Sequence, residues 1–406
     1  MTSPVSPREI GVDPAAEALL ASVVADAREG QYATYHRLRT MAPLLRTSNG
    51  TLVLTRYEDC ATAIRHRDLG AARPTVWSTH GRAGASLHSL VGILPFSDPP
   101  DHTRLRRAVA SAFTADAVER LRASVTRHAE TCVAGLADHG DFMAAVARPL
   151  TLHVTAELLG VPAADRPFLA TVAQAAAALV EPFTDEPTLA RTAAAARELY
   201  AYFTDVLAEK RRHPAPDLLS RLESSRDESG LDTLEVVALA ATLFVAGCNA
   251  AHMLGNGLRA LLDTPAQFAL LRRRPDLTAS AVEEMLRYDP PVQVMARRAR
   301  TALTLAGLEI EAGALVVAVL AAANRDPDRF TDPDRFDIIR DEGPHLSFAG
   351  GAHYCLGSQL ARLQAEIVFS RLPAVWGRIE PAGPAVLRPE STMRRLQSLP
   401  VRVHAA

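Results

Sequence analysis

Hydrophobic positions recur with a helical period over most of the chain between residues 103 and 262. The pattern is interrupted at 160–162, at 181–188 and at His213-Pro214. The most apolar stretch, 233–262, contains Ala246-Gly247, and we predict that it forms one long central helix that is buried on all sides. Further helices are predicted at 14–40, 59–67, 275–288 and from about Cys355 to Leu372.

Strand-like patterns are confined to short stretches. Residues 44–59 alternate around Asn49-Gly50, a strong hairpin signal. The apolar run 313–324 is too short to span a bilayer and indicates a buried strand. The sequence therefore predicts a mainly α protein with a minor β portion. That portion lies at about 40–60, 290–325 and 376–406, and residues 1–15 form a loosely held arm.

Composition and charge narrow the class of protein. The 406 residues are 48% hydrophobic and 22% charged, which is typical of a soluble globular protein. The formal net charge of −2 offers no electrostatic case for nucleic-acid binding. The N-terminal MTSPVSPREIG lacks a basic-then-apolar targeting signal, so we expect a cytoplasmic protein without membrane attachment. The four widely spaced cysteines predict reduced thiols.

One cysteine lies in an unusual setting. Residues 348–357 read FAGGAHYCLG, so Cys355 follows His353 by two residues and has three glycines around it. An isolated cysteine is usually a small buried hydrophobic residue. Here the glycines would let the backbone pass close to a bulky group, and a helix start at Cys355 would favour a thiolate. The lack of a second cysteine argues against structural zinc, and His353 is poorly placed as the base for a nucleophile. A single thiolate suits an axial ligand of haem iron.

The spacing Phe348-x-x-Gly351-x-His353-x-Cys355-x-Gly357 resembles the haem-binding loop of the cytochrome P450 family. The family usually has glycine directly after the phenylalanine, where this chain has Ala349, a small change that leaves haem binding expected. The resemblance implies a P450-like fold, with residues 16–406 as a single catalytic domain. It also implies haem b between the long central helix and the cysteine loop, with Cys355 as the metal ligand and His353 facing a propionate.

Two sets of charged residues, one mixed acidic and basic and one basic, extend the resemblance. Glu284 and Arg287 are three residues apart, so they can pair on one helix face. Together with Arg335 in PDRFD they resemble the Glu-Arg-Arg triad of the family, a structural clamp beneath the haem. His102 and Arg106 are four apart and also share a helix face. By resemblance these two and Arg297 bind the haem propionates, because two carboxylates in an apolar pocket need charged donors.

The chain departs from the family in its central helix, which reads AGCNAAH from Ala246. The family has an acid and then threonine where this chain has Asn249 and Ala250. Gly247 is still expected to leave room for dioxygen over the iron. Splitting the O–O bond consumes two protons, which an acid and an alcohol normally relay through water. Asn249 can donate a hydrogen bond but supplies no proton near neutral pH, and Ala250 can do neither.

Three interpretations of this departure stay open. The substrate can carry a polar group that holds the relay water, which gives substrate-assisted oxygen activation. The reaction can be atypical for the family, such as aromatic coupling, C–N bond formation or nitration. Finally, the protein can be a non-catalytic haem-binding recruitment or sensor module.

The resemblance also places a substrate pocket and partners. We expect a monomeric monooxygenase of specialised (secondary) metabolism, which acts on a small, bulky and largely apolar molecule. Electrons would come from a separate ferredoxin and ferredoxin reductase, received on a basic face with Arg104, Arg107 and Arg362 as candidates. The loop at 70–96 and the turn near 181–187 would help to line the pocket. Its other lining residues are predicted to be Leu243, Ala246, Ala250, Val292, Gln293, Val294, Met295 and Met393.

Overall fold

The computed structural model describes residues 13–25, 30–72, 94–136, 138–177, 186–388 and 393–405. Within these ranges the chain is mainly helical with several short strands, which confirms the predicted fold class. The chain divides into two compact units, each built from separated segments. The first unit comprises 1–72, 283–355 and 387–395, and the second comprises 73–282, 356–386 and 396–406.

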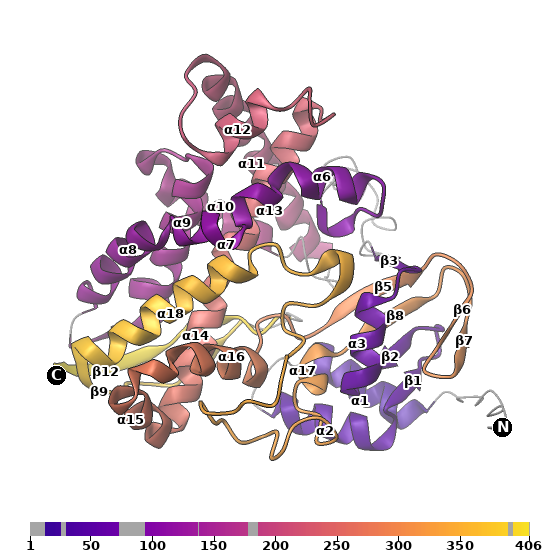
Figure 1. Ribbon diagram of the computed structural model, residues 1–406. Coiled ribbons are helices and arrows are strands. Elements are labelled where there is room, and N and C mark those ends of the chain that lie inside the picture. Colours follow the sequence, from indigo (N-terminus) through magenta and orange to yellow (C-terminus); the bar gives the residue numbers. More distant parts are fainter. Residues whose placement is uncertain are drawn as a thin grey trace. The chain divides into compact units, whose positions relative to one another are not determined.

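The first unit is organised around a five-stranded sheet (Figure 1). The strands run in the order β1 (Leu44–Arg46), β2 (Leu52–Leu54), β8 (Leu315–Ala318), β5 (Met295–Ala299) and β3 (Leu69–Ala71). The predicted hairpin at Asn49-Gly50 is confirmed, because β1 and β2 pair antiparallel with Leu45 opposite Val53. Strands β2 and β8 are parallel, and the other pairs are antiparallel.

Both faces of this sheet are covered. On one face Leu52 and Val316 pack with α3 (Tyr57–Arg65), a helix that buries Tyr57, Cys60, Ala61 and Ile64 at helical spacing. On the other face Val53 and Val317 pack with residues of α1 (Pro14–Ala25), α2 (Gln31–Met41) and α17 (Leu320–Ala323). Burial on both faces explains why β8 is apolar throughout rather than alternating. The predicted strand over 313–324 is corrected, because only Leu315–Ala318 is strand and Leu320–Ala323 is the buried helix α17. The unit also contains β6 (Leu303–Leu305), β7 (Leu308–Ile310) and the 3-10 turn η7 (Gly351–His353).

The second unit is a helical assembly (Figure 1). Its apolar core includes Phe203, Leu199, Val236, Phe244 and Leu169. The helices of this unit are α6 (Asp101–Ala110), α7 (Ala115–Glu119), α8 (Arg122–Ala134), α9 (Arg148–Leu159), α10 (Arg166–Ala176), α11 (Glu186–Arg212), α12 (Leu218–Ser224), α13 (Thr233–Cys248), α14 (Ala250–Asp263), α15 (Pro265–Arg273) and α18 (Ser358–Val375). Shorter turns are η1 (Leu94–Phe96), η2 (Ser111–Phe113), the π-turn η3 (Met143–Ala147), η4 (Ala163–Asp165) and η6 (Pro275–Leu277). Helix α16 (Thr278–Tyr288) carries the chain from the second unit into the first.

A small antiparallel sheet completes the second unit. Strand β12 (Pro400–Ala405) lies between β4 (His139–Asp141) and β9 (Trp376–Pro381), with Val401 opposite Gly140 and Val403 opposite Ile379. The short strands β10 (Val386–Leu387) and β11 (Leu396–Ser398) pair with each other. The three-residue strands β3 and β4 were absent from the sequence prediction, because stretches this short carry no measurable alternation.

The predicted central helix is corrected in two respects. It is two segments, α13 and α14, with an interruption at Asn249, and it is not buried on all sides, because Ala246 is exposed. It begins at a capping box, in which Asp232 accepts from the backbone of Glu235 and Glu235 accepts from the backbone of Asp232. Within the 31 residues from Thr233 to Asp263, the most apolar 18-residue window has a mean hydropathy of 1.8, enough by length and composition to cross a membrane. A buried core helix meets the same criterion, and half of the most apolar window is buried inside this protein.

Candidate active site

The cysteine loop closes on itself. The backbone N–H of Cys355 donates to the carbonyl of Phe348 over 2.9 Å, and the thiol-bearing side chain is exposed. The turn requires left-handed backbone at Gly351 (φ +64°) and at Ala349 (φ +59°), which is buried. Helix α18 begins at Ser358, three residues beyond Cys355, so the thiol lies just ahead of the helix rather than in its first turn as predicted.

Two glycines of the loop pack against helix α3, which sequence inspection did not anticipate. A Cβ at Gly350 would lie 3.0 Å from Cγ of Arg65, and one at Gly351 would lie 3.0 Å from the carbonyl oxygen of Ile64. At Gly357 a Cβ would meet no atom within 4 Å. The glycines at 350 and 351 therefore fix the loop on α3. No local pattern could have predicted this contact, because its partners are almost 300 residues apart in the chain.

The thiol of Cys355 differs from the other three in its surroundings. Cys60 and Cys132 are buried and Cys248 is partly buried, whereas Cys355 is exposed. Burial raises the pKa of the Cys248 thiol to about 12, and it raises the pKa values of Cys60 and Cys132 as well. These three thiols stay protonated at neutral pH, so they are poor metal ligands.

The donor set around Cys355 fits a metal that already has most of its ligands. Among the described residues, no three His, Cys, Asp or Glu side chains come together as a metal site built from protein alone would require. A single accessible thiol on a tightly folded loop can complete the coordination of an iron that a porphyrin already binds, but it cannot hold a bare zinc ion. The residues present therefore fit haem.

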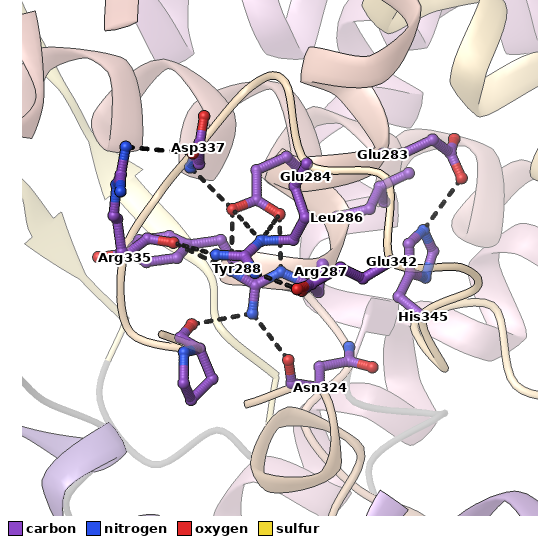
Figure 2. Close-up of polar contacts among 12 residues, drawn as sticks. Glu283, Glu284, Leu286, Arg287, Tyr288, Asn324, Arg335, Asp337, Glu342 and His345 are labelled. Atoms are coloured by element: carbon purple, nitrogen blue, oxygen red, sulfur yellow. Dashed lines mark hydrogen bonds and ion pairs between the residues drawn. The ribbon is translucent and has the colours of Figure 1, made fainter. Parts of the chain in front are cut away.

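The acidic–basic clamp on α16 is built as the sequence suggested for two of its members (Figure 2). The guanidinium of Arg287 donates to both carboxylate oxygens of Glu284, over 2.7 and 2.9 Å. It also donates to the carbonyls of Asn324 (2.8 Å) and Pro333 (2.9 Å). Only 1–3% of either side chain is exposed, so the pair ties α16 to the 324–337 segment of the same unit.

The third member of the clamp is Arg340, and the prediction of Arg335 was wrong for the side chain. Arg340 lies 3.3 Å from Glu284 and is 9% exposed. The side chain of Arg335 is 64% exposed and pairs with Asp337 instead, as Figure 2 shows, while its carbonyl accepts from Arg287 over 3.3 Å. The motif PDRFD indicated Arg335, the arginine closer in sequence to Glu284. Sequence order does not reveal which arginine side chain the loop turns toward Glu284.

The predicted propionate ligands lie on regular elements. His102 and Arg106 are on α6, where His102 is buried and Arg106 is half-buried. Arg297 is on β5 and is buried. His353 ends η7 and is half-buried, and Phe348 is also half-buried, with its ring centroid 6.4 Å from that of Tyr354. Their roles toward haem stay predictions.

Gly247 has a packing role in this structure. A Cβ at this position would lie 2.3 Å from the hydroxyl oxygen of Thr155, so glycine allows α9 and α13 to approach closely. Thr155 donates to the carbonyl of Thr151 over 2.7 Å, and Thr151 lies 3.4 Å from the carbonyl of Cys248. The role of Gly247 in making room for dioxygen stays a prediction, as do the roles of Asn249 and Ala250.

Other residues of the predicted pocket differ in exposure. Leu243 and Ala250 are half-buried and Ala246 is exposed, although most of α13 is buried. Val292, Val294 and Met295 are half-buried and Met393 is buried. Gln293 is 1% exposed, and its amide donates to the carbonyl of Pro290 and to the hydroxyl of Tyr32. The amide nitrogen of Gln293 thus already has hydrogen-bond partners within the first unit. Residues 73–93 and 181–185 of the two predicted pocket loops lie outside the described residues.

One predicted partner-binding residue has a different partner. Arg104 donates to both carboxylate oxygens of Glu235, over 2.6 and 2.8 Å, and to the carbonyl of Gly230. It therefore joins α6 to the start of α13. Arg107 is exposed and Arg362 is half-buried.

Comparisons with known proteins identify relatives of this chain. The cytochrome P450 family model matches residues 197–372. The monooxygenase PikC of Streptomyces venezuelae is 38% identical over 75% of this chain and 74% of its own length. Cytochrome P450 107B1 of Saccharopolyspora erythraea is 36% identical over 88% of this chain and 91% of its own.

Solved structures show the same fold. P450BioI, described in complex with an acyl carrier protein ligated to hexadec-9Z-enoic acid, superposes with a TM-score of 0.87 at 31% identity, over 92% of this chain and 98% of that one. The enzyme CxnD, described as forming a C–S bond in chuangxinmycin biosynthesis, gives a TM-score of 0.85 at 32% identity, over 95% and 97%. The chain belongs to the cytochrome P450 family of bacterial haem-dependent monooxygenases.

Proposed function

We propose that this monooxygenase oxidises a bulky, largely apolar small molecule of bacterial specialised metabolism, and that it relies on a polar group of the substrate to deliver protons. Two features of the chain together carry the proposal. Cys355 supplies an accessible thiol, and the central helix has Asn249 and Ala250 where the family has an acid and an alcohol.

The cofactor would be haem b, and the thiolate of Cys355 would bind its iron. His102, Arg106, Arg297 and His353 would neutralise the two propionates, since carboxylates in an apolar site need charged donors. When bound, the haem iron supplies the binding and reductive activation of dioxygen. The buried Glu284–Arg287–Arg340 clamp keeps the segment that leads to the cysteine loop in place.

The size and polarity of the substrate follow from the central helix. Leu243 and Ala246 on α13 and Ala250 at the start of α14 lie three and four residues apart. Ala246 is exposed and the other two are half-buried, although most of α13 is buried. Two of the three are alanines, which leave volume next to the helix for a large ligand. An apolar wall of this kind selects shape and hydrophobic area rather than charge.

Proton delivery distinguishes this chain from the family pattern. The Asn249 carboxamide can orient water by donating and accepting hydrogen bonds, but it has no proton to transfer at neutral pH. The methyl side chain of Ala250 cannot hydrogen-bond to water. A hydroxyl, amide or amine of the substrate can hold the missing water at that position, which makes oxygen activation dependent on the correct substrate.

An atypical reaction is the second candidate. The same Asn249-Ala250 departure favours it, since coupling or C–N bond formation places different demands on proton delivery. The neighbour CxnD, described as forming a C–S bond, supports this candidate as an example of bond formation other than hydroxylation on this fold. A haem-binding recruitment or sensor module without turnover is the third candidate.

Electrons come from a separate ferredoxin and its reductase. A basic surface would receive the acidic ferredoxin, and Arg107 and Arg362 are the candidates on it. Arg104 is withdrawn from this role, because Glu235 already neutralises it. We place the monomeric protein in the cytoplasm.

The haem assignment is tested by the absorption spectrum of the reduced, carbon-monoxide-bound protein. The wild type and a Cys132→Ser control should show the thiolate-ligated band, and Cys355→Ser should lose it. If Cys355→Ser kept the wild-type spectrum, the assignment of the ligand would be wrong.

The relay hypothesis is tested with Asn249→Asp and Ala250→Thr. A panel of macrolides and steroids is first screened for a shift of the ferric Soret band and for product. With a turned-over compound, Ala250→Thr should change the ratio of product formed to electrons consumed. Unchanged coupling and product in both variants would remove the missing relay as an explanation. A protein that binds haem, accepts electrons and converts no compound would favour the sensor.

A further inference from the structure

A buried cluster of charged and aromatic side chains lies within the first unit, and the proposed chemistry does not use it. Its centre is the ion pair between Arg394 and Asp289, with 3.0 Å between Nε and a carboxylate oxygen. The exposed fractions of the two side chains are 6% and 9%. The hydroxyl of Tyr32 donates to the same carboxylate over 2.7 Å, and Arg394 also donates to the side-chain oxygen of Gln31 over 3.3 Å.

A second arginine stabilises the same cluster from another direction. The guanidinium of Arg325 lies 3.6 Å from the ring centroid of Tyr32 and 3.8 Å from that of Tyr288. It donates to the carbonyl of Tyr288 and pairs with Asp334 at 3.0 Å. The cluster thus anchors helix α2 to the segment after α16.

The ion pair sits where two predicted pocket segments meet. Asp289 precedes the segment Val292–Met295 by three residues, and Arg394 directly follows Met393. The two segments are also joined through the backbone. Val292 and Met393 form an antiparallel bridge, and the N–H of Arg394 donates to the carbonyl of Pro291 over 2.7 Å. Charge pairing and backbone pairing therefore fix the same spacing.

A buried ion pair adds little net stability compared with two well-packed apolar side chains, because both charges lose their hydration. What it imposes is geometry, since its attraction depends on the distance and direction of the two groups. Removal of one partner leaves a buried charge that draws in water or moves outward, and the attached backbone moves with it.

We propose that the Arg394–Asp289 pair, braced by Tyr32, is a positioning device that sets the separation of Val292–Met295 from Met393 and thereby decides which bulky ligands the pocket accepts. This inference rests on the proposed function, in which both segments line the pocket. Arg394 and Asp289 act through the segments they hold and touch no reacting atom.

The experiment compares ligands of different bulk on the haem-loaded protein. Imidazole is a small iron ligand that would make little contact with the pocket walls, whereas econazole carries bulky aromatic groups on its imidazole that would reach them. Both are titrated by the Soret shift, and the ratio of the two dissociation constants is the readout. Arg394→Gln should change this ratio about tenfold or more while imidazole affinity stays near wild type, because a wall displaced by about 1 Å affects only the large ligand.

The matched control is Arg325→Gln. Arg325 is as buried as Arg394 and contacts the same tyrosine, but it makes none of the contacts to the 393–394 segment given above. Its loss should lower stability and leave the ratio within about threefold of wild type, a difference of roughly 0.7 kcal/mol. If Arg394→Gln fails to accumulate, the near-isosteric Asp289→Asn keeps the shape, removes the charge and should move the ratio in the same way.

Equal ratios in the wild type and in whichever cluster variant is obtained would overturn the positioning role. A ratio that moved equally in Arg325→Gln would also overturn it, by showing a general loosening of the unit. A wild-type protein that gave no Soret shift with imidazole would refute the proposed haem site itself, which is a different outcome from a failure of the positioning role of Arg394 and Asp289.

Discussion

The finding that Arg340, and not Arg335, is the third member of the acidic–basic clamp gives a quantitative prediction for stability. Beyond Glu284, Arg340 donates to the carbonyls of Thr331 (2.6 Å), Asp332 (3.2 Å) and Arg335 (3.1 Å), and it pairs with Glu342. A charged donor contributes roughly 1 kcal/mol net for each neutral carbonyl that it satisfies, and less where the distance is long. Arg340→Gln should therefore lower the free energy of unfolding by about 3 kcal/mol.

Arg335→Gln is the matched variant in the same loop. It removes one ion pair, to Asp337, from a side chain that is 64% exposed. Solvent screening limits such a contact to about 0.5 kcal/mol.

The assay is thermal unfolding of the two variants at equal haem content. For a chain of this size 1 kcal/mol corresponds to roughly 1.2 °C in Tm, so we expect a loss of about 4 °C for Arg340→Gln and about 0.6 °C for Arg335→Gln. Equal losses, or a larger loss for Arg335→Gln, would refute the assignment of the third clamp position to Arg340.

Three further predictions concern the backbone, packing and pH. Ala349 has a φ of +59°, so Ala349→Gly relieves backbone strain but adds entropy to the unfolded chain. The free energy of unfolding in urea should therefore stay within about 0.5 kcal/mol of the wild-type value for Ala349→Gly and fall by about 2 kcal/mol for Ala349→Val. Gly247→Ala should lower the free energy of unfolding by about 2 kcal/mol, because its Cβ overlaps Thr155. Adding Thr155→Ala should recover part of that loss, and strictly additive effects of the two substitutions in a double-mutant cycle would exclude the contact. The hydrogen bonds from Arg104 hold the pKa of Glu235 below its usual value, so this contact stabilises the fold at neutral pH and its contribution disappears as pH falls through the lowered pKa. Glu235→Gln should be less stable than wild type by about 1 kcal/mol at pH 7 and nearly equal to it in acid, and a constant difference in stability across that pH range would contradict the linkage.

The sequence allowed the fold class, the hairpin at Asn49-Gly50 and the Glu284–Arg287 pair to be predicted, because each depends on local spacing. Hairpin turns and pairs three apart on a helix are fixed by backbone geometry within a few residues. The long-range choices were not predictable in this way. Arg335 and Arg340 carry the same charge within one irregular segment, and only the path of the loop decides which one faces Glu284.

The candidate site follows the same rule. Cys355 was identifiable from its neighbours in the chain, but the packing of its loop on α3 and the contact of Gly247 with Thr155 join segments that sequence inspection treats separately. Gln293 is a further example, since a polar residue in an apolar stretch suggested a ligand contact while its amide is held by Tyr32 and Pro290.

The unequal shielding of the four thiols has a practical consequence. In the cofactor-free chain a maleimide dye should modify position 355 first, since the remaining sulfur atoms are shielded from solvent and stay protonated at neutral pH. Coordination to iron would hide that sulfur as well. The rate of dye incorporation should therefore fall as the fraction of protein that holds the cofactor rises. Mass spectrometry can follow this rate without any knowledge of the natural substrate.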